Sequence, residues 1–556
     1  MTDLKKPFGI DLGTTYSAIA HLDATGRPDA IGNREGSKTT PSVIMFDPSG
    51  EIVVGSEAKN EAVQNADRVV EMVKRYMGSE GWQHTIDGVD WTPETLSALI
   101  LGKLARDASD AVGVPVEDVV ISHPAYFTDV ERAATRAAGV IAGLNVLGLV
   151  EEPVAAAYAY SMTSEEELEG NILVYDLGGG TFDACVISVS PVGSGRDIRV
   201  LVTEGQHTLG GKDWDQRILD YTLSEFGVRT GMDLDAYGSG AMGEDASTRY
   251  RELLQDLTER VEVAKWALTQ PQKSKARIGV NFEDARETVE LTREQFDEMT
   301  ADLLLRTMDS TRQALDTARE KGVEKIDKVL LVGGSSRMLQ VEDAVSSLMG
   351  PDVGRLLYEP DLAVAKGAAY VAMHKELFKS TAGSGDVTPE EARERAESFL
   401  PATVGDSLVD TTFSIVVSHS LGIVTVDDST TPESRVVSHI IPAQSPAPFS
   451  ETRRYGTHRE GQQAALLEVK QGDSEVPEDC HDLGQVELTL PRPMPRGTDI
   501  DVTLTMNAEG ILEVSGLQPD TGAVANAIVE RPAIMSQDRQ LEAAREQPSL
   551  IERMRD

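Results

Sequence analysis

Cysteine is nearly absent from this sequence, with only Cys185 and Cys480 among 556 residues. Neither cysteine has partners at metal-ligand spacing, and a disulfide framework is implausible. Long apolar runs are lacking as well: no stretch of about 18 apolar residues is available to cross a bilayer, and residues 1–7 contain no apolar signal core. These absences exclude disulfide-rich and membrane-spanning classes, and we expect a cytoplasmic protein.

Positive charge is also in short supply. The chain has 52 Lys and Arg residues against 92 Asp and Glu residues, which gives a formal net charge of −40 and a pI near 4.6. No basic stripe interrupts this acidity. A surface of this sign repels nucleic acid and anionic membranes, so neither is expected as a partner, and solubility explains the acidity itself.

The length indicates more than one domain, because a chain of 556 residues exceeds what a single core supports. Residues 1–376 alternate apolar strands with amphipathic helices, which predicts an α/β domain. Residues 377–410 are polar, and a capping box at Thr388 predicts one short helix within a linker. Residues 411–530 are expected to form a β-sandwich, and residues 531–556 a short helical tail.

The β-sandwich prediction rests on short runs of strand-forming residues after Thr411. Turn signals such as those at residues 471–473 and 507–510 separate the runs. We expect strands at residues 413–417, 464–469, 485–490, 500–506 and 511–514.

One short pattern occurs twice, at residues 8–20 and again at residues 172–186. Each copy predicts a buried strand, a turn containing Asp-Leu-Gly with a Thr close by, and a second strand. A tight glycine-rich hairpin exposes backbone N–H groups that can surround a phosphate. Asp11 and Asp176 stand at the mouths of the hairpins, where each can hold a hydrated Mg²⁺. Two such hairpins facing each other predict a clamp on a nucleotide triphosphate between duplicated lobes.

One Asp-x-Gly-Thr alone is a weak signal, because turns favour these residues. Two copies in matching strand contexts, followed in order by Gly333-Gly334-Ser335, are far more specific. The ordered set resembles the nucleotide-binding domain of heat shock protein 70 (Hsp70) chaperones of the DnaK type, within the actin-like ATPase superfamily. The resemblance runs from residue 7 to about residue 373, and less strongly to about residue 530. Further matching stretches are residues 73–78, 123–127, 152–157, 209–215, 359–361 and 367–369.

The resemblance implies an actin-like ATPase domain of two duplicated lobes that binds ATP or ADP with Mg²⁺. Two aspartates would hold the metal through its waters, and a lysine would steady the attacking water and the γ-phosphate. A glutamate, a threonine and a third aspartate would complete the polar shell, which suits phosphoryl transfer. The two metal-holding aspartates are Asp11 and Asp176, and the lysine is Lys74. The glutamate, the threonine and the third aspartate are Glu152, Thr181 and Asp183. All of these residues except Asp183 are expected to act in hydrolysis.

The resemblance also assigns the residues that would bind the nucleotide. Those around the phosphates are Gly13, Thr14, Thr15, Tyr16, Gly178, Gly179 and Gly180, with Gly210 and Gly211 nearby. Those around the adenosine are Gly333, Gly334, Ser335, Arg337 and Asp361. Glu262, Lys265 and Thr269 share one helix face because of their spacing. In the family that face holds ribose and adenine, and an ordinary solvated helix face is the alternative.

Several positions bear on how this chain would work within the family pattern. Pro124 and Arg132 match positions that relay the nucleotide state to the linker. Trp266 stands where an Arg usually packs on adenine; an indole can stack there but brings no charge. Gly148 stands where many members carry an Arg that docks J-domain co-chaperones, which leaves that partnership open. Residues 407–410 form a thin version of the apolar linker, and the family's helical lid has no counterpart.

Our interpretation is an ATP-dependent chaperone whose slow ATP hydrolysis controls how the β-sandwich engages unfolded or extended polypeptides. Strand-edge backbone bonds with side-chain pockets are the expected mode of engagement. A nucleotide exchange factor is considered as a further partner. Three alternatives stay open: a nucleotide-binding co-chaperone or scaffold with vestigial hydrolysis, an actin-like filament protein, and a sugar kinase of the same superfamily.

Overall fold

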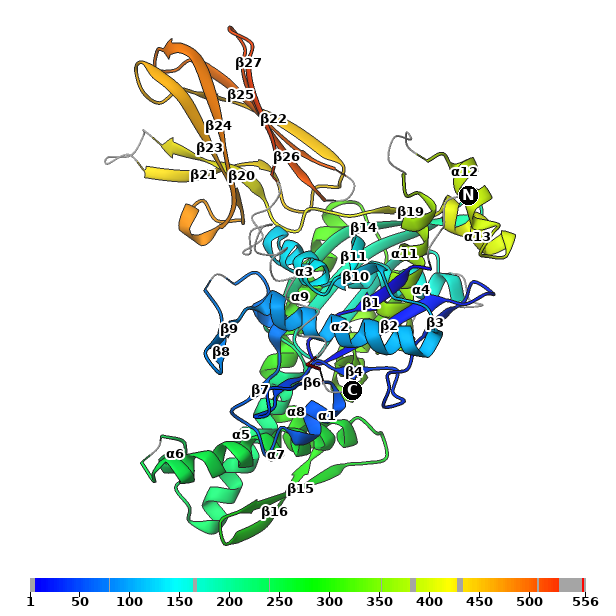
Figure 1. Ribbon diagram of the computed structural model, residues 1–556, viewed down its shortest axis with the longest axis vertical. Coiled ribbons are helices and arrows are strands. Elements are labelled where there is room, and N and C mark those ends of the chain that lie inside the picture. The colour runs from blue at the N-terminus through cyan, green and yellow to red at the C-terminus, as the bar shows by residue number, and fades with distance from the viewer. Residues whose placement is uncertain are drawn as a thin grey trace.

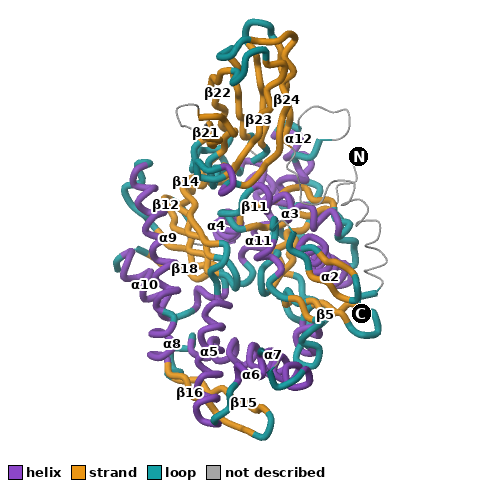
Figure 2. The backbone as a smooth tube through the Cα atoms, turned by 90° about the vertical axis from the view of Figure 1, so that its left-hand side faces the viewer, coloured by secondary structure: helices purple, strands orange, loops and turns teal. Residues whose placement is uncertain are grey.

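Two α/β lobes and a β-sandwich make up the protein (Figure 1). Figure 2 shows strands of the sandwich above the two lobes, with α9 and α10 on one side and α2 on the other. The predicted fold class is confirmed. Among the residues described, no helix is both long enough and apolar enough to cross a membrane. The computed structural model describes residues 6–79, 81–163, 168–239, 241–351, 353–380, 387–427, 434–507, 510–529 and 553–554.

Lobe I, formed by the described residues up to 151, is built on a sheet of order β11-β10-β1-β2-β3, with β4 paired to β2. β1 runs parallel to β10 and antiparallel to β2. The small β6-β5-β7 sheet and the β8–β9 hairpin complete the lobe. Its elements are β1 (Phe8–Asp11), β2 (Tyr16–Leu22), β3 (Pro28–Ala30), β4 (Thr40–Pro41), β5 (Ile44–Phe46), β6 (Ile52–Val54), α1 (Ser56–Glu61), β7 (Val69–Val70), the 3-10 helix η1 (Val73–Tyr76), β8 (His84–Ile86), β9 (Val89–Trp91), α2 (Pro93–Val112), β10 (Asp118–His123), α3 (Asp129–Ile141) and β11 (Asn145–Glu151).

Lobe II is formed by the described residues of 170–357 and has a sheet of order β18-β17-β12-β13-β14-β19, whose edge strand β19 (Thr412–Ser414) comes from later in the chain. β12 runs parallel to β17 and antiparallel to β13, so the strand order of lobe I is repeated. This repetition confirms the duplication that the two hairpin motifs predict. Its elements are β12 (Gly170–Leu177), β13 (Phe182–Val192), β14 (Gly195–Gln206), α5 (Gly211–Thr230), α6 (Leu234–Gly238), α7 (Glu244–Leu268), β15 (Lys275–Phe282), β16 (Ala285–Thr292), α8 (Arg293–Met299), α9 (Ala301–Glu320), β17 (Lys328–Val332), the 3-10 helix η2 (Gly334–Arg337), α10 (Leu339–Met349) and β18 (Gly354–Leu357).

Two helices, α4 (Glu152–Thr163) and α11 (Ala363–Leu377), join the lobes. Their side chains form a core cluster that includes residues of both sheets, separate from the core inside each lobe. α11 passes so close to β1 that a Cβ atom on Gly9 would lie 2.0 Å from the backbone nitrogen of Ala369. The small residues of α11 therefore allow the lobes to meet at one shared base.

One prediction for the segment after α11 is wrong. The sequence predicts a single short helix within residues 377–410, whereas the structure has α12 (Pro389–Ala396) and also α13 (Ala402–Asp410). α12 begins with the predicted capping box. α13 forms because Leu408 and Val409 bury their side chains in the core between the lobes. The residues that we interpreted as a thin linker are therefore helical.

A second correction concerns the strand predicted at residues 413–417. β19 (Thr412–Ser414) does not join the sandwich but pairs in parallel with β14 at the edge of the lobe II sheet. An open sheet edge offers unpaired backbone groups, and this short segment satisfies them. The predicted helical tail at residues 531–556 lies outside the described residues, apart from 553–554.

The β-sandwich is confirmed as two four-stranded sheets, β21-β20-β23-β24 and β22-β25-β26-β27. Alternate residues of facing strands fill the space between the sheets, with Leu467 and Val469 on one side and Val502 and Leu504 on the other. Four predicted strands correspond to β23–β26. The elements are β20 (Leu421–Asp427), β21 (Ser434–Ile441), β22 (Phe449–Gly456), β23 (Gln462–Gln471), the 3-10 helix η3 (Pro477–Asp479), β24 (His481–Met494), β25 (Asp499–Met506), β26 (Leu512–Gln518) and β27 (Ala523–Val529).

Candidate active site

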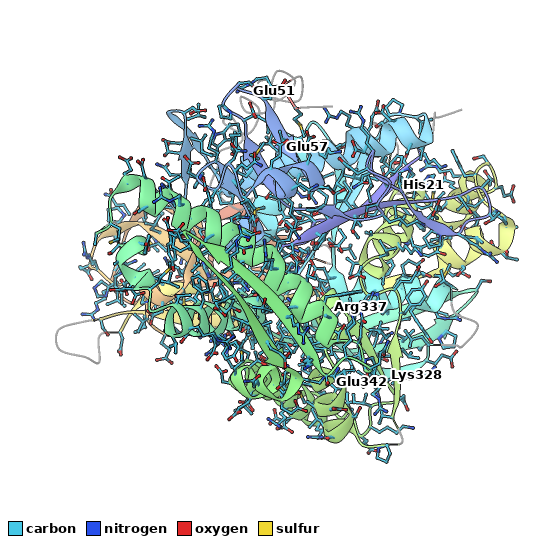
Figure 3. The ribbon with its side chains drawn as sticks, turned by 90° about the horizontal axis from the view of Figure 1, so that it is seen from below. His21, Glu51, Glu57, Lys328, Arg337 and Glu342 are labelled. Atoms are coloured by element: carbon cyan, nitrogen blue, oxygen red, sulfur yellow. The ribbon has the colours of Figure 1, made fainter. Side chains whose placement is uncertain are left out.

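A cavity of about 530 Å³ lies between the two lobes. Both predicted hairpins contribute to its wall, together with η1, α4, α7 and η2. Figure 3 views the molecule from below, with Glu51 and Glu57 of lobe I at the top and Arg337 of lobe II beneath them. The predicted site residues that line the cavity are Asp11, Gly13, Thr14, Thr15, Tyr16, Lys74, Glu152, Asp176, Gly178, Gly179, Thr181, Glu262, Lys265, Thr269, Gly333, Gly334, Ser335, Arg337 and Asp361.

Three predicted glycines, Gly180, Gly210 and Gly211, lie beside this wall and not on it. A Cβ atom on Gly180 would come within 2.3 Å of the Thr14 side chain, and one on Gly210 within 2.5 Å of the Gly180 backbone nitrogen. The N–H of Gly211 donates to the carbonyl oxygen of Gly178 at 2.9 Å. The turns pack so closely that larger residues would not fit, which brings the backbones of both hairpins to one cavity.

Lys74 and Glu152 form a buried ion pair at the cavity wall. The Lys74 ammonium donates to Glu152 Oε1 at 2.5 Å, and both residues are less than a tenth exposed. Lys74 lies on η1, which starts after Met72 in the left-handed region at φ 61°. Glu152 is the first residue of α4. The pair therefore fixes a largely buried cation in the wall of the cavity.

The carboxylates around Lys74 carry more negative charge than one lysine balances. Burial, and then the charge of Glu152, raises the pKa of Asp11 to about 7 and that of Asp183 to about 7. The same two causes raise the pKa of Asp176 well above its usual value. A hydrogen bond from the Ser122 hydroxyl to Asp11, at 3.0 Å, partly offsets the shift there. The cluster is therefore short of positive charge.

A hydrated divalent cation fits this charge deficit. Mg²⁺ keeps several waters and is usually bound by one or two carboxylates together with substrate phosphates. Asp11 and Asp176 both line the cavity, one from each hairpin. Within the described part of the chain, no three His, Cys, Asp or Glu residues form a direct metal cage. The donor set thus suits a metal held through water.

Ion pairs between the lobes border the cavity, and sequence reasoning missed them. Lys59 of α1 donates to Glu262 Oε2 of α7 at 2.7 Å and to the Tyr16 hydroxyl at 2.8 Å. Burial would raise the pKa of Glu262, but the positive charges of Lys212 and Lys59 outweigh that effect and lower it. Lys59 has no motif around it, so no sequence signal marked it.

A second bridge between the lobes joins Arg75 and Asp213. The Arg75 guanidinium donates to the Asp213 carboxylate at 2.6 Å and to the carbonyl oxygen of Gly180 at 2.9 Å. Both residues belong to stretches that resemble the family, although neither was given a role. The bridge holds η1, which carries Lys74, against the hairpin of lobe II.

Comparison with known proteins gives the family of this chain. The family described as Hsp70 protein matches residues 7–87, 80–376 and 402–553. The Chaperone protein DnaK of Thermosipho africanus (strain TCF52B) is 35% identical over 539 residues, which cover 95% of this chain and 81% of that protein. The chain belongs to the Hsp70 family. The predicted family is confirmed, and membership argues against the filament and sugar-kinase alternatives.

The cavity wall of this Hsp70 family member also includes Trp266 on α7, which is more than half exposed. Glu262, Lys265 and Thr269 line the same cavity, which favours a binding face over a solvated one. Arg337 donates to the Asp361 carboxylate at 2.6 Å, and both residues line the cavity as well. An indole in this wall can stack on a flat ring.

The β-sandwich contacts both lobes of the Hsp70 domain, and one glutamine takes part in the contact with each lobe. Gln471 of β23 accepts the backbone N–H of Asp129 in lobe I at 2.8 Å. Gln444 accepts the N–H of Thr203 in lobe II at 3.0 Å and donates to its carbonyl oxygen at 2.7 Å. The sandwich is therefore hydrogen-bonded to both lobes.

The positions that resemblance links to coupling lie near these contacts. Arg132 is buried and ion-paired to Asp129, and a Cβ atom on Gly510 of the sandwich would come within 3.4 Å of its guanidinium. Pro124 begins the loop that leads to α3. Gly148 on β11 is covered by Lys375, since a Cβ atom there would lie 2.4 Å from Lys375 Cε. A cation thus covers the position at which the family pattern has Arg.

Proposed function

We propose that this protein is an ATP-dependent chaperone of the DnaK type, in which a nucleotide bound between the lobes controls how the β-sandwich engages unfolded or extended polypeptides. One observation carries the proposal. The two hairpins and the Lys74–Glu152 pair converge on a single cavity between lobes that both contact the sandwich. A change in lobe position on hydrolysis would therefore reach the sandwich directly.

The residues at the cavity have distinct parts in this proposal. Asp11 and Asp176 would hold Mg²⁺ through water, and when bound the metal neutralises charge on the phosphates. Lys74 orients the attacking water and stabilises the charge that develops on the γ-phosphate. Glu152 holds Lys74 in place by accepting its hydrogen bond at 2.5 Å. Thr181 donates its hydroxyl from the lobe II hairpin.

The adenosine end and the partners complete the proposal. Trp266 would stack on the base, with Glu262, Lys265 and Arg337 providing polar contacts around the ribose and the ring. The sandwich would take an extended segment by strand-edge hydrogen bonds. An exchange factor and a J-domain partner stay predictions, as does a cytoplasmic location.

Single-turnover ATP hydrolysis tests the proposal, measured with and without a short unfolded apolar peptide. We expect slow turnover that the peptide accelerates, and a loss of about 100-fold or more in Lys74→Ala. Lys103→Ala is the matched control, because Lys103 is also a buried, ion-paired lysine of lobe I but lies outside the cavity. Both variants are first checked for a folded ATPase domain.

The outcomes separate this function from its rival. Tight ATP binding with turnover that does not depend on Lys74 would contradict the enzyme proposal and favour a scaffold with vestigial hydrolysis. Turnover that depends on Lys74 but ignores the peptide would keep the ATPase and remove the proposed client coupling. Equal losses in the Lys74 and Lys103 variants would show that the loss comes from removing a buried charge.

A further inference from the structure

Residues 553 and 554 lie on lobe I, although they follow the β-sandwich in the sequence. In Figure 1 the C mark lies over lobe I, near β4 and β6 and away from the sandwich. The backbone N–H of Ile52 donates to the carbonyl oxygen of Arg553 at 2.9 Å, and Ile52 and Met554 form a parallel bridge. β6 pairs with β5 on its other side. The segment therefore extends the small sheet by strand addition.

Two side chains anchor this contact. Met554 is 4% exposed and belongs to the core cluster of lobe I, together with Phe46 and Ile52. The guanidinium of Arg553 donates twice to the carbonyl oxygen of Gly50, at 2.9 and 2.7 Å. A guanidinium of lobe I, that of Arg106, donates to the Met554 carbonyl oxygen at 3.4 Å. The contact combines backbone pairing, an apolar pocket and a recognised cation.

We propose that this edge of lobe I, formed by Gly50, Ile52 and Arg106 and here termed the β6 edge site, is a peptide-binding site for an extended Arg-Met segment. Its occupant is the chain's own Arg553–Met554, bound in cis. The site lies apart from the cavity between the lobes, since none of its residues lines that cavity. Figure 3 labels Glu51, between Gly50 and Ile52, on the lobe I side of the molecule.

The tether explains how so small a contact can stay occupied. A few hydrogen bonds and one buried methionine give weak binding between separate molecules, in a range around millimolar. Because the segment belongs to the same chain, its effective concentration at the site is of the same order, about millimolar. Residues 530–552 can span at most roughly 80 Å when extended, which is ample for a molecule of this size. A weak site held in cis can also release its segment.

The consequence is a second tie between the β-sandwich and the ATPase domain. The sandwich is joined to the lobes before β20 through α12 and α13, and after β27 by the anchored segment. Because Met554 shares a core with Ile10 and Leu12 of the lobe I hairpin, the anchor is attached to the same rigid body as half of the nucleotide cavity.

Hydrogen exchange of the Ile52 amide tests this proposal in the full chain. That N–H has Arg553 as its acceptor, so we expect exchange at least about ten-fold faster in Met554→Asp than in the unaltered protein. Met242→Asp is the matched control, because Met242 is an exposed methionine of lobe II. The Phe46 amide of β5 donates to the carbonyl oxygen of Arg68, just before β7, at 3.0 Å, and it reports whether lobe I stays folded.

Equal Ile52 exchange in Met554→Asp and the unaltered protein, with Phe46 protected in both, would overturn the site. A synthetic peptide of residues 549–556, added to Met554→Asp at millimolar concentration, is expected to restore protection. Failure of that peptide, or equal restoration by a peptide carrying the same Met→Asp change, would overturn recognition of the segment. Protection that falls when the unaltered protein is diluted about 100-fold would show a second copy as the occupant and overturn binding in cis.

Discussion

The two hairpins share one backbone plan but differ in the residue that is paired with the aspartate proposed to bind the metal. In lobe I, Asp11 is paired across the hairpin with Ala18. In lobe II, Asp176 is paired with a second carboxylate, Asp183, whose oxygens accept the N–H groups of Ala125 at 3.2 Å and Tyr126 at 3.3 Å. The duplication thus preserves the two hairpins that are proposed to surround the nucleotide. Because of this difference, lobe II is hydrogen-bonded directly to the loop of lobe I that leads to α3.

The sheets that carry these hairpins differ too. β13 and β14 are 11 and 12 residues long, whereas β2 and β3 have 7 and 3 residues. The longer lobe II strands reach the segment before the sandwich, and β19 pairs with them. Lobe I instead contacts the sandwich through α3. The comparison indicates that the lobes are alike where they would bind nucleotide. They differ where they contact the β-sandwich and the segment before it, through which a change in lobe position would reach the sandwich.

The largest effect is expected for the feature that the two lobes share, which is the aspartate on each hairpin. Asp11→Asn and Asp176→Asn should each reduce Mg²⁺-dependent hydrolysis by about 10- to 100-fold, because each removes one anchor for metal-bound water. The double variant should lose less than the product of the two, since the residues act as one unit. Single-turnover rates across a Mg²⁺ titration measure both losses, with Asp23→Asn, on an exposed turn of lobe I, as control.

The same titration has a pH dependence whose sign follows from burial. Burial and the charge of Glu152 raise the pKa of Asp11 to about 7, so the carboxyl is protonated below that pH and must lose its proton to bind metal. The Mg²⁺ concentration needed for half-maximal rate should therefore rise as pH falls through 7. If only one of the variants Asp11→Asn and Asp176→Asn lost Mg²⁺-dependent hydrolysis, the idea that the two hairpins act alike would be contradicted.

A smaller effect is expected where the lobes differ. Gln471→Ala removes the acceptor for Asp129 in lobe I, and Gln444→Ala removes two hydrogen bonds to Thr203 in lobe II. Each should lower peptide stimulation of hydrolysis by about 2- to 10-fold, because a single such bond has a modest net value and the two bonds of Gln444 go to the same residue. Neither residue lines the cavity, so basal hydrolysis should stay unchanged.

The control for these variants is Gln462→Ala, since the Gln462 side chain makes its hydrogen bonds within the sandwich. A greater loss from Gln444 than from Gln471 would place the stronger coupling on lobe II. Basal hydrolysis that falls in parallel with stimulation would instead indicate damage to the ATPase domain, and the assignment of these glutamines to coupling would fail.

Much of the site follows from sequence because each hairpin is a local structure. The Asp-Leu-Gly turns need glycine where two backbones meet, so a few adjacent residues are enough to predict each turn. Lys59 and Glu262 could not be paired in advance, because they are 203 residues apart and charged residues are common throughout the chain. Their meeting depends on how the lobes close around the cavity.

The two errors in the fold have a related cause. Leu408 and Val409 form too short an apolar run to distinguish a helix from an extended linker, and burial against α11 decides for the helix. Phe413 lies in a run with strand character, but pattern alone does not say which sheet it joins. The open edge of β14 decides that.

The smallest expected effect concerns a titratable contact between the lobes. Glu131 of α3 and His207, which follows β14, lie 3.0 Å apart, and the His207 ring stacks on Phe127 at 6.0 Å. Burial would lower the pKa of His207, but the hydrogen bond and charge of Glu131 outweigh it and raise the pKa. The pKa of Glu131 is lowered, because the hydrogen bond and charge of His207 outweigh the opposing effect of burial.

The stabilisation from His207 is therefore complete below its unfolded pKa of 6.5 and disappears as pH rises through the raised value, whereas the stabilisation from Glu131 is lost only as pH falls below 4.5. We expect His207→Asn to lower the melting temperature of the ATPase domain by about 1–3 °C near pH 6 and by less near pH 9. His84→Asn, on β8, is the control. A difference between His207→Asn and the unaltered protein that grows from pH 6 to pH 9 would contradict the pairing and leave Asp183 as the contact that joins the lobes on this side.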